Sequence, residues 1–463
     1  MDLERVISAL APTDVVSRAP AEVRDLAYDA RAVEPGTLFF CVPGARFDGH
    51  DFAAEALAAG AVALVVERPL DLPVPQLVVA DARAAMAAAA DAFFGEPTRE
   101  LTVAGVTGTN GKTTTAFLLY AILAAAGKRP GLLGTIECRV GGERRPAVRT
   151  TAEAIDLQRA FREMLDVGDR SCAIEATSHG SELRRLDGVR FSALVFTNLS
   201  QDHLDFHGTM ERYFDAKRRL FLEGSPPAAI NVGDSWGRRL AADRPDALTF
   251  GLVDGAEVGP GALEGIDLKL RGRFNVENAL GAVAAGRLLG LPDEAIVTGI
   301  ESVTGVPGRF EAIDEGQPFT VVVDYAHTPD SLENVLRTAR DLAEARVLCV
   351  FGCGGDRDRG KRPVMGRLAR ELADVAIVTS DNPRSEEPLA IIEEILAGSG
   401  PDVEVEPDRR AAIARAIEQG EPGDVVVIAG KGHEQGQEFR DGKIPFDDRE
   451  VAREALRRLG ARA

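Results

Sequence analysis

Residues 106–115 read VTGTNGKTTT, a glycine-rich turn that carries one lysine and a run of threonines. The apolar stretch 101–106 before it predicts a buried strand, and the stretch 114–126 after it predicts a helix. Such a turn aims backbone N–H groups and a helix N-terminus at one point, which favours a bound anion. The stretch therefore predicts an α/β fold with a phosphate-binding loop.

The lysine and the threonine after it indicate that the anion is a nucleotide. Lys112 would reach the β- and γ-phosphates, and the Thr113 hydroxyl would hold Mg²⁺. The strict spacing GxxxxGK[ST] requires glycine where this chain has Val106, so the loop matches a GxxGKT variant. An ordinary glycine turn is the alternative, but the glycines, the lysine and the threonine all fall in register between strand and helix.

The composition indicates a globular protein of several domains. A chain of 463 residues, 45% of them apolar, predicts two to four domains. The formal net charge of −19 disfavours nucleic acid or an anionic membrane as a partner, because either would be repelled. The five cysteines contain no CxxC pair, which favours free thiols and a reducing compartment. With no signal peptide and no apolar run of membrane-spanning length, we expect a cytoplasmic protein.

Three blocks separate along the chain. Residues 1–98 alternate short apolar strands with alanine-rich helices and predict a small N-terminal α/β domain. Residues 99–311 hold the phosphate loop, and residues 312–463 open a second series of strands and helices. This alternation predicts a P-loop-type parallel sheet in the centre and a Rossmann-like parallel sheet at the C-terminal end, with ligands at the carboxyl edges. The predicted strands are 37–42, 61–66, 76–79, 101–106, 171–175, 193–197, 228–231, 347–351, 375–379 and 424–428.

Carboxylates and imidazoles follow two predicted strands of the central block. Glu175 ends one strand, where it would bind Mg²⁺ or polarise a nucleophile. After the next strand, TNLSQDHLDFHG packs into six residues Asp202, His203, Asp205 and His207. Oxygen and imidazole ligands so close together suggest a second metal near the nucleotide, and hydrogen-bonded structural roles are the alternative.

Two further motifs have both a functional and a structural interpretation. Lys217 lies in MERYFDAKRRLF, which predicts an amphipathic helix, and it would ordinarily be a solvated surface lysine. Asn275 and Asn278 open the predicted helix FNVENALGAVAA, where their amides would contact an adenine edge or cap the helix. The residues alone leave both choices open.

Several loops of the last block follow strands of one sheet and converge on its carboxyl edge. VVVDYAHTP places Asp324, Tyr325 and His327 after a strand and predicts a ribose or phosphate site. VFGCGGDRDRGKRP combines glycines with arginines and a lysine, which is typical of an anion site, and a solvated charged loop is the alternative. Together with DNPR and GKGHE, the motif VFGCGGDRDRGKRP predicts a pocket for a ligand that bears carboxylates and an ammonium. The candidate residues of this pocket are Arg357, Arg384 and Glu434.

The motifs GTNGKTT, EATSHG, TNLSQDHLDFHG, YFDAKRRLF, FNVENA, GRFE and DYAHTPD occur in this order and resemble the Mur ligase family. GCGGDRDRGKRP, DNPR and GKGHE resemble its branch that adds the third residue of the muramyl peptide. DNPR resembles the type that adds meso-diaminopimelate. Arg384 suits that ligand, because a guanidinium can grip a distal carboxylate that lysine lacks. The resemblance covers essentially the whole chain.

The resemblance implies ATP-dependent amide formation with Mg²⁺. The γ-carboxylate of UDP-N-acetylmuramoyl-L-alanyl-D-glutamate would attack ATP to give an acyl phosphate, from which the amine of meso-diaminopimelate would displace phosphate. The protein would position the reactants, neutralise charge and close its domains to exclude water. By the same resemblance, the three blocks bind the UDP moiety, ATP and the amino acid, in that order.

The resemblance also assigns roles to individual residues. The catalytic residues would be Lys112, Glu175, His203 and Lys217. The Mg²⁺ ligands would be Thr113, Glu175, His203 and Lys217, the last of them carbamylated. ATP contacts would come from Gly108, Thr109, Asn110, Gly111, Lys112, Thr113, Thr114, Asn275, Arg309 and Asp324. Contacts to the UDP-peptide would come from Tyr28, Ala30, Ala45, Arg46, Phe47, Thr150, Thr151, Thr177 and Arg185. Diaminopimelate contacts would come from Arg357, Asp381, Asn382, Pro383, Arg384, Gly430 and Glu434.

Four positions depart from the family pattern. Ala30 stands in YDAR where relatives commonly show DSR, so it offers no hydroxyl to the UDP moiety. Arg149 precedes TT where some relatives have asparagine, and Leu183 falls where a glutamine can contact the peptide. Thr177 replaces a serine conservatively. All four changes lie on the UDP-peptide side, whereas the ATP and amino-acid motifs are intact.

Three other functions fit parts of the pattern: a lysine-adding muramyl ligase, a folylpolyglutamate-type synthetase, and a nucleotide-binding scaffold without ligase activity. The N-terminal block and DNPR disfavour the synthetase, and the intact catalytic motifs disfavour the scaffold. We expect a monomer whose partners are ATP, the UDP-N-acetylmuramoyl dipeptide and meso-diaminopimelate.

Overall fold

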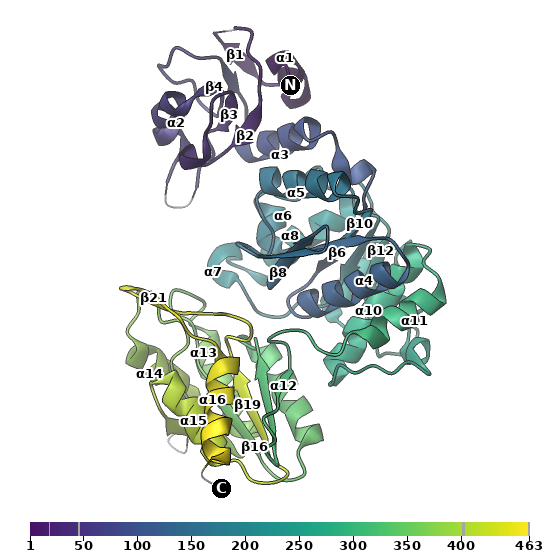
Figure 1. Cartoon of the computed structure of the whole chain (residues 1–463), viewed down its shortest axis with the longest axis vertical. Coiled ribbons are helices and arrows are strands. Elements are labelled where there is room, and N and C mark those ends of the chain that lie inside the picture. The colour runs from purple at the N-terminus through teal and green to yellow at the C-terminus, as the bar shows by residue number, and fades with distance from the viewer. Residues whose placement is uncertain (18, 45–46, 401–402, 462–463) are drawn as a thin grey trace.

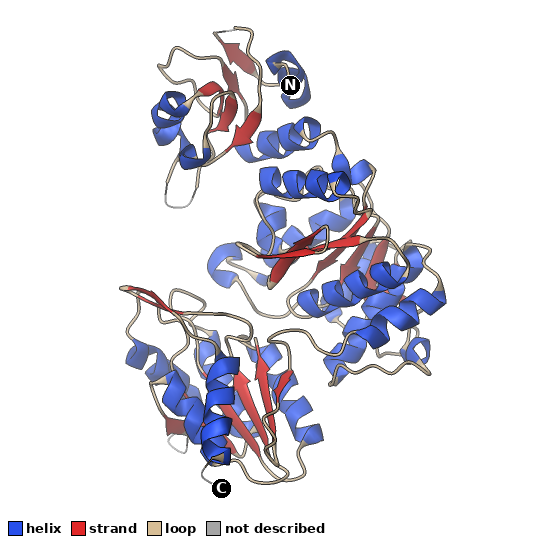
Figure 2. Ribbon diagram, viewed as in Figure 1, coloured by secondary structure: helices blue, strands red, loops and turns tan. Residues whose placement is uncertain are grey.

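The three-domain α/β fold predicted from the sequence is confirmed by the structure, a computed structural model that describes residues 1–17, 19–44, 47–400 and 403–461. The domains follow one another along the molecule, with the central domain between the N-terminal and C-terminal domains (Figure 1). Each domain is a sheet with helices packed against it (Figure 2).

The N-terminal domain has a five-stranded sheet in the order β1-β5-β4-β3-β2, in which β1 is antiparallel to β5 and the other neighbours are parallel. Asp81 caps the N-terminus of helix α3, since its side chain accepts hydrogen bonds from the first turn, and the helix packs Met86 onto the sheet. The same core includes Ala154 and Ile155 of the central domain, so a buried apolar contact joins the two domains. The strands are β1 (Asp14–Val16), β2 (Asp25–Ala27), β3 (Thr37–Phe40), β4 (Ala61–Val66) and β5 (Gln76–Val78). The helices are α1 (Leu3–Leu10), η1 (Ala30–Ala32), η2 (Gly49–Phe52), α2 (Ala53–Ala59) and α3 (Ala82–Phe93).

The central domain is an eight-stranded sheet in the order β13-β12-β11-β6-β10-β7-β8-β9. Glu175 of β10 pairs with Val106 of β6, and Phe196 of β11 pairs with Thr107, so these strands end at one edge. Helices α4, α10 and α11 bury one face of the sheet, and α5 and α8 bury the other. The strands are β6 (Thr102–Thr107), β7 (Pro130–Leu133), β8 (Glu137–Val140), β9 (Glu143–Pro146), β10 (Ser171–Glu175), β11 (Ala193–Phe196), β12 (Ala228–Asn231) and β13 (Leu248–Phe250). The helices are η3 (Pro97–Arg99), α4 (Lys112–Ala125), α5 (Ala154–Asp166), α6 (Ser178–Glu182), α7 (Leu204–His207), α8 (Met210–Leu222), α9 (Ser235–Asp243), η4 (Pro260–Leu263), α10 (Arg273–Leu288) and α11 (Asp293–Ser302).

The C-terminal domain has a six-stranded sheet in the order β14-β15-β19-β16-β17-β18, parallel except for β14, and a separate hairpin β20-β21. Thr328 and Ser331 form a capping box that starts α12, and Pro329 occupies the first helical position. The strands are β14 (Glu311–Ile313), β15 (Thr320–Asp324), β16 (Val347–Phe351), β17 (Val375–Val378), β18 (Glu404–Val405), β19 (Val425–Ala429), β20 (Gln437–Phe439) and β21 (Gly442–Ile444). The helices are α12 (Pro329–Leu342), α13 (Lys361–Leu372), α14 (Pro388–Ser399), α15 (Arg409–Glu418) and α16 (Asp448–Gly460).

The domain limits that we propose from the sequence fall after residues 98 and 311. The first lies in η3, just before β6. The second lies inside β14, which begins at Glu311 and pairs with β15 of the C-terminal sheet. All five cysteines are free thiols. Within the residues that the structure describes, no helix is long and apolar enough to cross a membrane.

Candidate active site

The phosphate loop connects β6 to α4, and its two glycines are in close contact with other side chains. Gly108 and Gly111 have φ angles of 150° and 84°, which other residues rarely adopt. A Cβ on Gly108 would lie 1.9 Å from Thr197 Oγ1, and one on Gly111 would lie 2.1 Å from Asn278 Oδ1. Both positions therefore require glycine, and the loop backbone reaches the N-terminus of α4, where an anion is favoured.

Two lysines converge on the carbonyl oxygen of Gly108. Lys112 Nζ donates to this oxygen at 3.0 Å and to the Thr109 carbonyl at 2.8 Å. Lys217 Nζ donates to the same Gly108 oxygen at 2.8 Å. Burial lowers the pKa of Lys112, which lines the cleft beside the loop. The first lysine thus lies where a bound phosphate would meet it.

Lys217 is buried in α8, with 1% of its surface exposed, so the interpretation as a solvated surface lysine is wrong. Its Nζ lies 4.8 Å from the centre of the Tyr213 ring. Burial, and to a lesser degree the charge of Lys112, hold the pKa of Lys217 well below its usual value. Burial therefore favours the uncharged form of this amine.

Glu175, at the end of β10, accepts hydrogen bonds from two threonines. Its Oε2 accepts from Thr113 Oγ1 at 3.0 Å and from Thr135 Oγ1 at 2.9 Å, and its Oε1 accepts from the Thr135 backbone N–H at 2.7 Å. Arg309 donates to Thr113 Oγ1 at 3.1 Å. The sequence interpretation missed Thr135, although the segment GTIE directly after the apolar strand β7 offered a signal for a residue at this edge.

The cluster of Asp202, His203, Asp205 and His207 is divided by the fold. Asp202 and His203 line the cleft, with His203 Nε2 3.4 Å from Asp202 Oδ2. His207 instead hydrogen-bonds the Ser178 hydroxyl at 3.0 Å, and Asp205 is exposed. Burial lowers the pKa of both histidines, so their rings are neutral. In the described part of the chain, no group of three or more His, Cys, Asp or Glu side chains could hold a metal ion. The predicted cluster does not by itself form a metal site, and Mg²⁺ here would need phosphate oxygens as further ligands.

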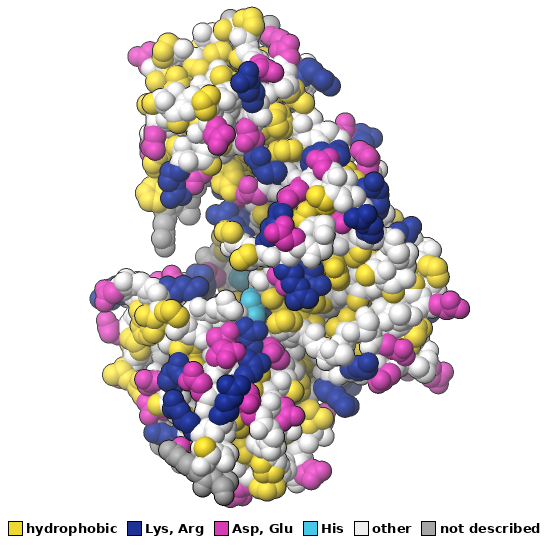
Figure 3. Space-filling model, viewed as in Figure 1, with side chains coloured by type: hydrophobic (Ala, Val, Ile, Leu, Met, Phe, Trp, Pro, Cys, Tyr) yellow, Lys and Arg dark blue, Asp and Glu magenta, His cyan; other side chains and the backbone are white. Residues whose placement is uncertain are grey.

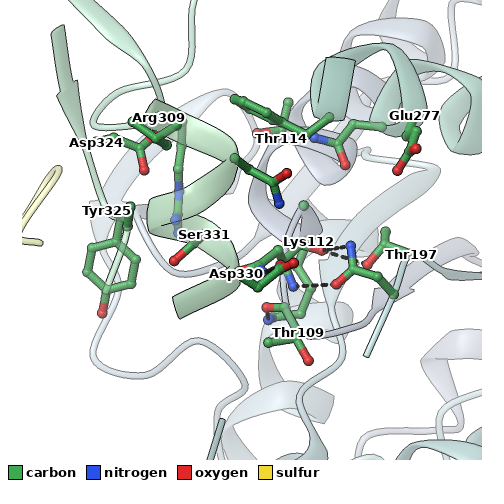
Figure 4. A pocket seen from close by; sticks show the side chains of 18 of the residues that line it. Thr109, Lys112, Thr114, Thr197, Glu277, Arg309, Asp324, Tyr325, Asp330 and Ser331 are labelled. Carbon is green, nitrogen blue, oxygen red and sulfur yellow. Dashed lines mark hydrogen bonds between the residues drawn. The ribbon is translucent and has the colours of Figure 1, made fainter. Parts of the chain in front are cut away.

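Three of the four catalytic candidates, Lys112, Glu175 and His203, line a cleft of about 730 Å³ between the central domain and helix α12 of the C-terminal domain. Lys217 is buried and is not among the residues that line this cleft. Asp330 and Ser331 of α12 lie near Lys112 and Thr109 of the phosphate loop (Figure 4). Histidine side chains are visible where the two domains meet (Figure 3). The proposed ATP contacts that line the cleft are Thr109, Asn110, Gly111, Lys112, Thr113, Thr114, Arg309 and Asp324.

Asn275 and Asn278 differ in their positions. Asn278 lines the cleft beside Gly111, whereas Asn275 is behind it. Asn275 Oδ1 accepts a hydrogen bond from Asn278 Nδ2 at 3.1 Å, and its own Nδ2 donates to the Arg271 carbonyl at 2.7 Å. Asn275 thus supports Asn278, which is the amide that lines the cleft.

Polar contacts across the cleft join the central and C-terminal domains. Asn110 Nδ2 donates to Asp330 Oδ2 at 2.6 Å, and Gln201 Nε2 donates to Asp358 Oδ2 at 2.8 Å. Sequence interpretation missed Asp330 and Gln201, because the first contact joins segments 220 residues apart. Across the same cleft, burial raises the pKa of Asp324 to about 6.

The amino-acid candidates Asn382, Gly430 and Glu434 meet at the carboxyl edge of the C-terminal sheet. Asn382 Nδ2 donates to Glu434 Oε2 at 2.9 Å, and Asn382 Oδ1 accepts from the buried Lys431 Nζ at 2.7 Å. Gly430 has a φ of 125°, and a Cβ there would lie 2.5 Å from Asp381 Oδ2. Lys431 was missed, although it is the lysine of the GKGHE motif.

Arg384 lies between these loops and the hairpin β20-β21. Its Nη1 donates to the Gly355 carbonyl at 2.7 Å and its Nε to Glu438 Oε2 at 3.1 Å. Pro383 precedes it, with the Pro383 carbonyl 1.9 Å from where a Cβ on Gly355 would lie. Arg357 is exposed and donates to the Asp356 carbonyl at 3.0 Å. The structure therefore gathers the predicted amino-acid candidates around three neighbouring loops.

Four of the UDP-peptide candidates surround Glu175. Thr151 Oγ1 donates to the Glu175 carbonyl at 2.7 Å and accepts from Thr177 Oγ1 at 3.0 Å. Arg185 donates to the Thr151 carbonyl at 3.0 Å, and Thr150 Oγ1 accepts from Thr135 at 3.1 Å. These side chains would be next to a carboxylate that reacts near Glu175.

The other UDP-peptide candidates lie in the N-terminal domain. The Tyr28 hydroxyl donates to Asp156 of α5 at 2.8 Å, and Ala30 is buried in η1. Phe47 is 71% exposed, and its ring lies 6.2 Å from that of Phe52. Two candidates, Ala45 and Arg46, lie outside the described residues.

A phosphate loop at the carboxyl edge of the mixed, mostly parallel central sheet, and a second, mostly parallel sheet across a cleft, define a nucleotide-binding α/β protein. Residues 22–105 match the model "Mur ligase family, catalytic domain", and residues 106–286 match "Mur ligase middle domain". Residues 308–432 match "Mur ligase, glutamate ligase domain". The chain belongs to the Mur ligase family.

Several relatives carry one name, UDP-N-acetylmuramoyl-L-alanyl-D-glutamate--2,6-diaminopimelate ligase. The protein of that name from Solibacter usitatus is 49% identical, over 96% of this chain and 95% of its own length. The one from Geobacillus thermodenitrificans is 46% identical over 99% of both chains. A solved structure of such a ligase has a TM-score of 0.66 and 34% identity, over 96% of both chains.

Proposed function

We propose that this chain catalyses the ATP-dependent addition of meso-diaminopimelate to UDP-N-acetylmuramoyl-L-alanyl-D-glutamate in peptidoglycan precursor synthesis. The observation that supports this most strongly is the 49% identity, over 96% of the chain, to a ligase of that name. The candidate active site supports this function, because the phosphate loop is suited to bind a nucleotide and the carboxyl edge of the C-terminal sheet is suited to bind an amino acid with two carboxylates.

In this reaction, the γ-carboxylate of the D-glutamyl residue attacks the γ-phosphorus of ATP, and ADP leaves. The amine of diaminopimelate then adds to the acyl carbon, phosphate leaves, and the amine loses a proton as the amide forms. Lys112 and the amides of the phosphate loop neutralise the phosphates, and Arg309 adds a second cation near Thr113. The protein contributes chiefly position and charge.

Thr113, Glu175 and His203 would hold Mg²⁺, which offsets phosphate charge when it is bound. Their chemistry fits a hard cation, since a hydroxyl and a carboxylate oxygen already lie 3.0 Å apart. Lys217 takes part as a carbamate: its neutral amine adds to CO₂ and releases a proton, which turns a buried base into an anion beside the loop. Asn278 supports the nucleotide, with Asn275 behind it.

The other substrates occupy opposite ends of the site. The dipeptide extends from Glu175, past Thr177 and Arg185, toward Tyr28 and Ala30 of the N-terminal domain. Diaminopimelate lies among the loops of the C-terminal domain, with Arg384 on a carboxylate and Glu434 on an ammonium. We further propose that the protein is a cytoplasmic monomer and that its domains end at residues 98 and 311.

A phosphate-release assay tests this function. With ATP, Mg²⁺ and the UDP-linked dipeptide, release should depend on meso-diaminopimelate and be at least about tenfold slower with L-lysine, because lysine has no distal carboxylate for a bidentate contact. Lys112→Ala serves as the inactive control.

Each alternative has its own outcome in this assay. Equal or better use of L-lysine would assign the lysine-adding activity. Release with glutamate and a folate acceptor would assign a synthetase, and ATP binding without turnover would assign a scaffold.

A further inference from the structure

The loops that carry Arg357 and Arg384 hold each other in place. The first loop, residues 352–360, follows β16, and the second, residues 379–387, follows β17. The backbone N–H of Gly355 in the first loop donates to the Asn382 carbonyl in the second at 2.9 Å. Arg384 Nη1 returns a hydrogen bond to the Gly355 carbonyl at 2.7 Å. The position of the Arg384 guanidinium therefore depends on the spacing of the two loops.

A buried arginine beneath the loops contacts both of them. Arg362, in the first turn of α13, is 0% exposed, and its Nη1 and Nη2 donate to the two carboxylate oxygens of Glu386 at 2.9 and 2.8 Å. Nη2 also donates to the Gly354 carbonyl at 3.2 Å. Glu386 Oε1 in turn accepts from the Asp356 backbone N–H at 2.6 Å. One guanidinium thus contacts the first loop directly and reaches it again through a carboxylate of the second.

The strength and the direction of these bonds suit a positioning role. Paired N–H···O bonds between a guanidinium and a carboxylate fix orientation as well as distance. The Arg362 guanidinium holds the pKa of Glu386 at about 2, so this carboxylate is ionised at neutral pH. Arg384 itself has a φ of 51°, a left-handed conformation that its surroundings must support.

We propose that Arg362 and Glu386 are positioning residues for the amino-acid substrate, which fix the spacing of the two loops so that Arg384 meets a substrate carboxylate. The pair does not itself touch the reacting atoms. This inference rests on the proposed function, since it concerns how the same site selects an amino acid with a second carboxylate.

The chain offers a matched control for this role. Glu394 of α14 also accepts from Arg362 Nη1, at 2.9 Å, but its other hydrogen bonds run to Arg359 and not to Asp356. Glu386→Ala and Glu394→Ala therefore each remove one carboxylate from Arg362. Of the two, Glu386→Ala also removes the bond to the Asp356 N–H that ties one loop to the other.

Steady-state kinetics of the full-length enzyme distinguishes these variants. Glu386→Ala should raise the KM for meso-diaminopimelate about tenfold or more, as loss of charged hydrogen bonds predicts, and leave the KM for ATP nearly unchanged. The preference for meso-diaminopimelate over L-lysine should fall by a similar factor. Glu394→Ala should change neither quantity, and Glu386→Gln should recover part of the loss because its amide oxygen can still accept.

Two results would overturn the proposal: equal effects of the Glu386 and Glu394 variants, or an equal rise of both KM values. Thermal unfolding checks that each variant folds, and if Glu386→Ala does not, Glu386→Gln against Glu394→Gln decides with the same readouts. A wild-type enzyme that does not use meso-diaminopimelate would instead refute the proposed function.

Discussion

Lys112 and Lys217 donate to the same carbonyl oxygen, yet their surroundings give them different chemistry. Lys112 lines the cleft, where bound phosphates would favour its protonated form. Lys217 is buried behind the loop, near the Tyr213 ring, and burial holds the pKa of its amine well below its usual value. The residue type alone therefore does not fix the chemistry of a lysine, because burial and neighbouring charges shift its pKa.

Arg384 gives a prediction at the scale of one residue. Arg384→Lys should raise the KM for meso-diaminopimelate by about tenfold or more, because an ammonium cannot make the paired contacts of a guanidinium. It should also lose the bond from Nε to Glu438. Initial rates at varied amino acid and varied ATP measure this, and an unchanged KM for the amino acid would remove Arg384 from the pocket. Arg410→Lys, at an exposed ion pair with Glu454, is the control.

At the scale of elements, the sequence predicted the central strands well and the edge strands poorly. Strands 171–175, 228–231 and 347–351 have the predicted bounds, because continuous apolar runs mark buried parallel strands. The last two strands at one end of the central sheet, β8 and the edge strand β9, read ECRV and ERRP; they have no such run and were not predicted.

The candidate site was likewise predicted only in part. The phosphate loop was predicted because strand, turn and helix are adjacent in the sequence. The sequence did not predict three other residues of the site, because their partners come from distant segments: Thr135, Lys431 and Asp330. The burial of Lys217 was likewise invisible in a sequence whose helix carries several charged residues.

The phosphate loop gives a prediction for one element. Gly111→Ala should abolish nucleotide binding, since its Cβ would lie 2.1 Å from Asn278 Oδ1 and its φ of 84° disfavours alanine. Calorimetric titration with a non-hydrolysable ATP analogue measures the loss. Gly261→Ala is the control, because a Cβ there meets nothing within 4 Å. Normal nucleotide affinity in Gly111→Ala would contradict the role given to this loop.

At the scale of the whole molecule, two kinds of contact connect the three domains. The N-terminal and central domains share a buried apolar core through Ala154 and Ile155. Across the cleft, hydrogen bonds such as that between Asn110 and Asp330 connect the central and C-terminal domains. Hydrogen bonds can be exchanged for water, whereas a shared core must stay closed, so domain closure should move the C-terminal domain.

The contact between Asn110 and Asp330 can be tested directly. Asp330→Ala should weaken the link between the phosphate loop and α12 and raise the KM for ATP a few-fold, about the loss of one charged hydrogen bond. Hydrogen exchange should become faster in the first turn of α12. Glu333→Ala is the control on the same helix, where Glu333 pairs with the exposed Arg337. Identical exchange in the two variants would show that this contact does not couple the domains.

The N-terminal domain shares an apolar core with helix α5 of the central domain, which fixes the distance between sites on these two domains. Tyr28, in the N-terminal domain, is hydrogen-bonded to Asp156 of the central domain, and Glu175 lies in β10 of that same central domain. A nucleotide-linked peptide held at its uridine end can therefore present its carboxylate at one fixed distance. If the acceptor binds as proposed, one that is one amino acid shorter or longer would place that carboxylate away from Glu175, so we expect the enzyme to select its acceptor by length as well as by chemistry.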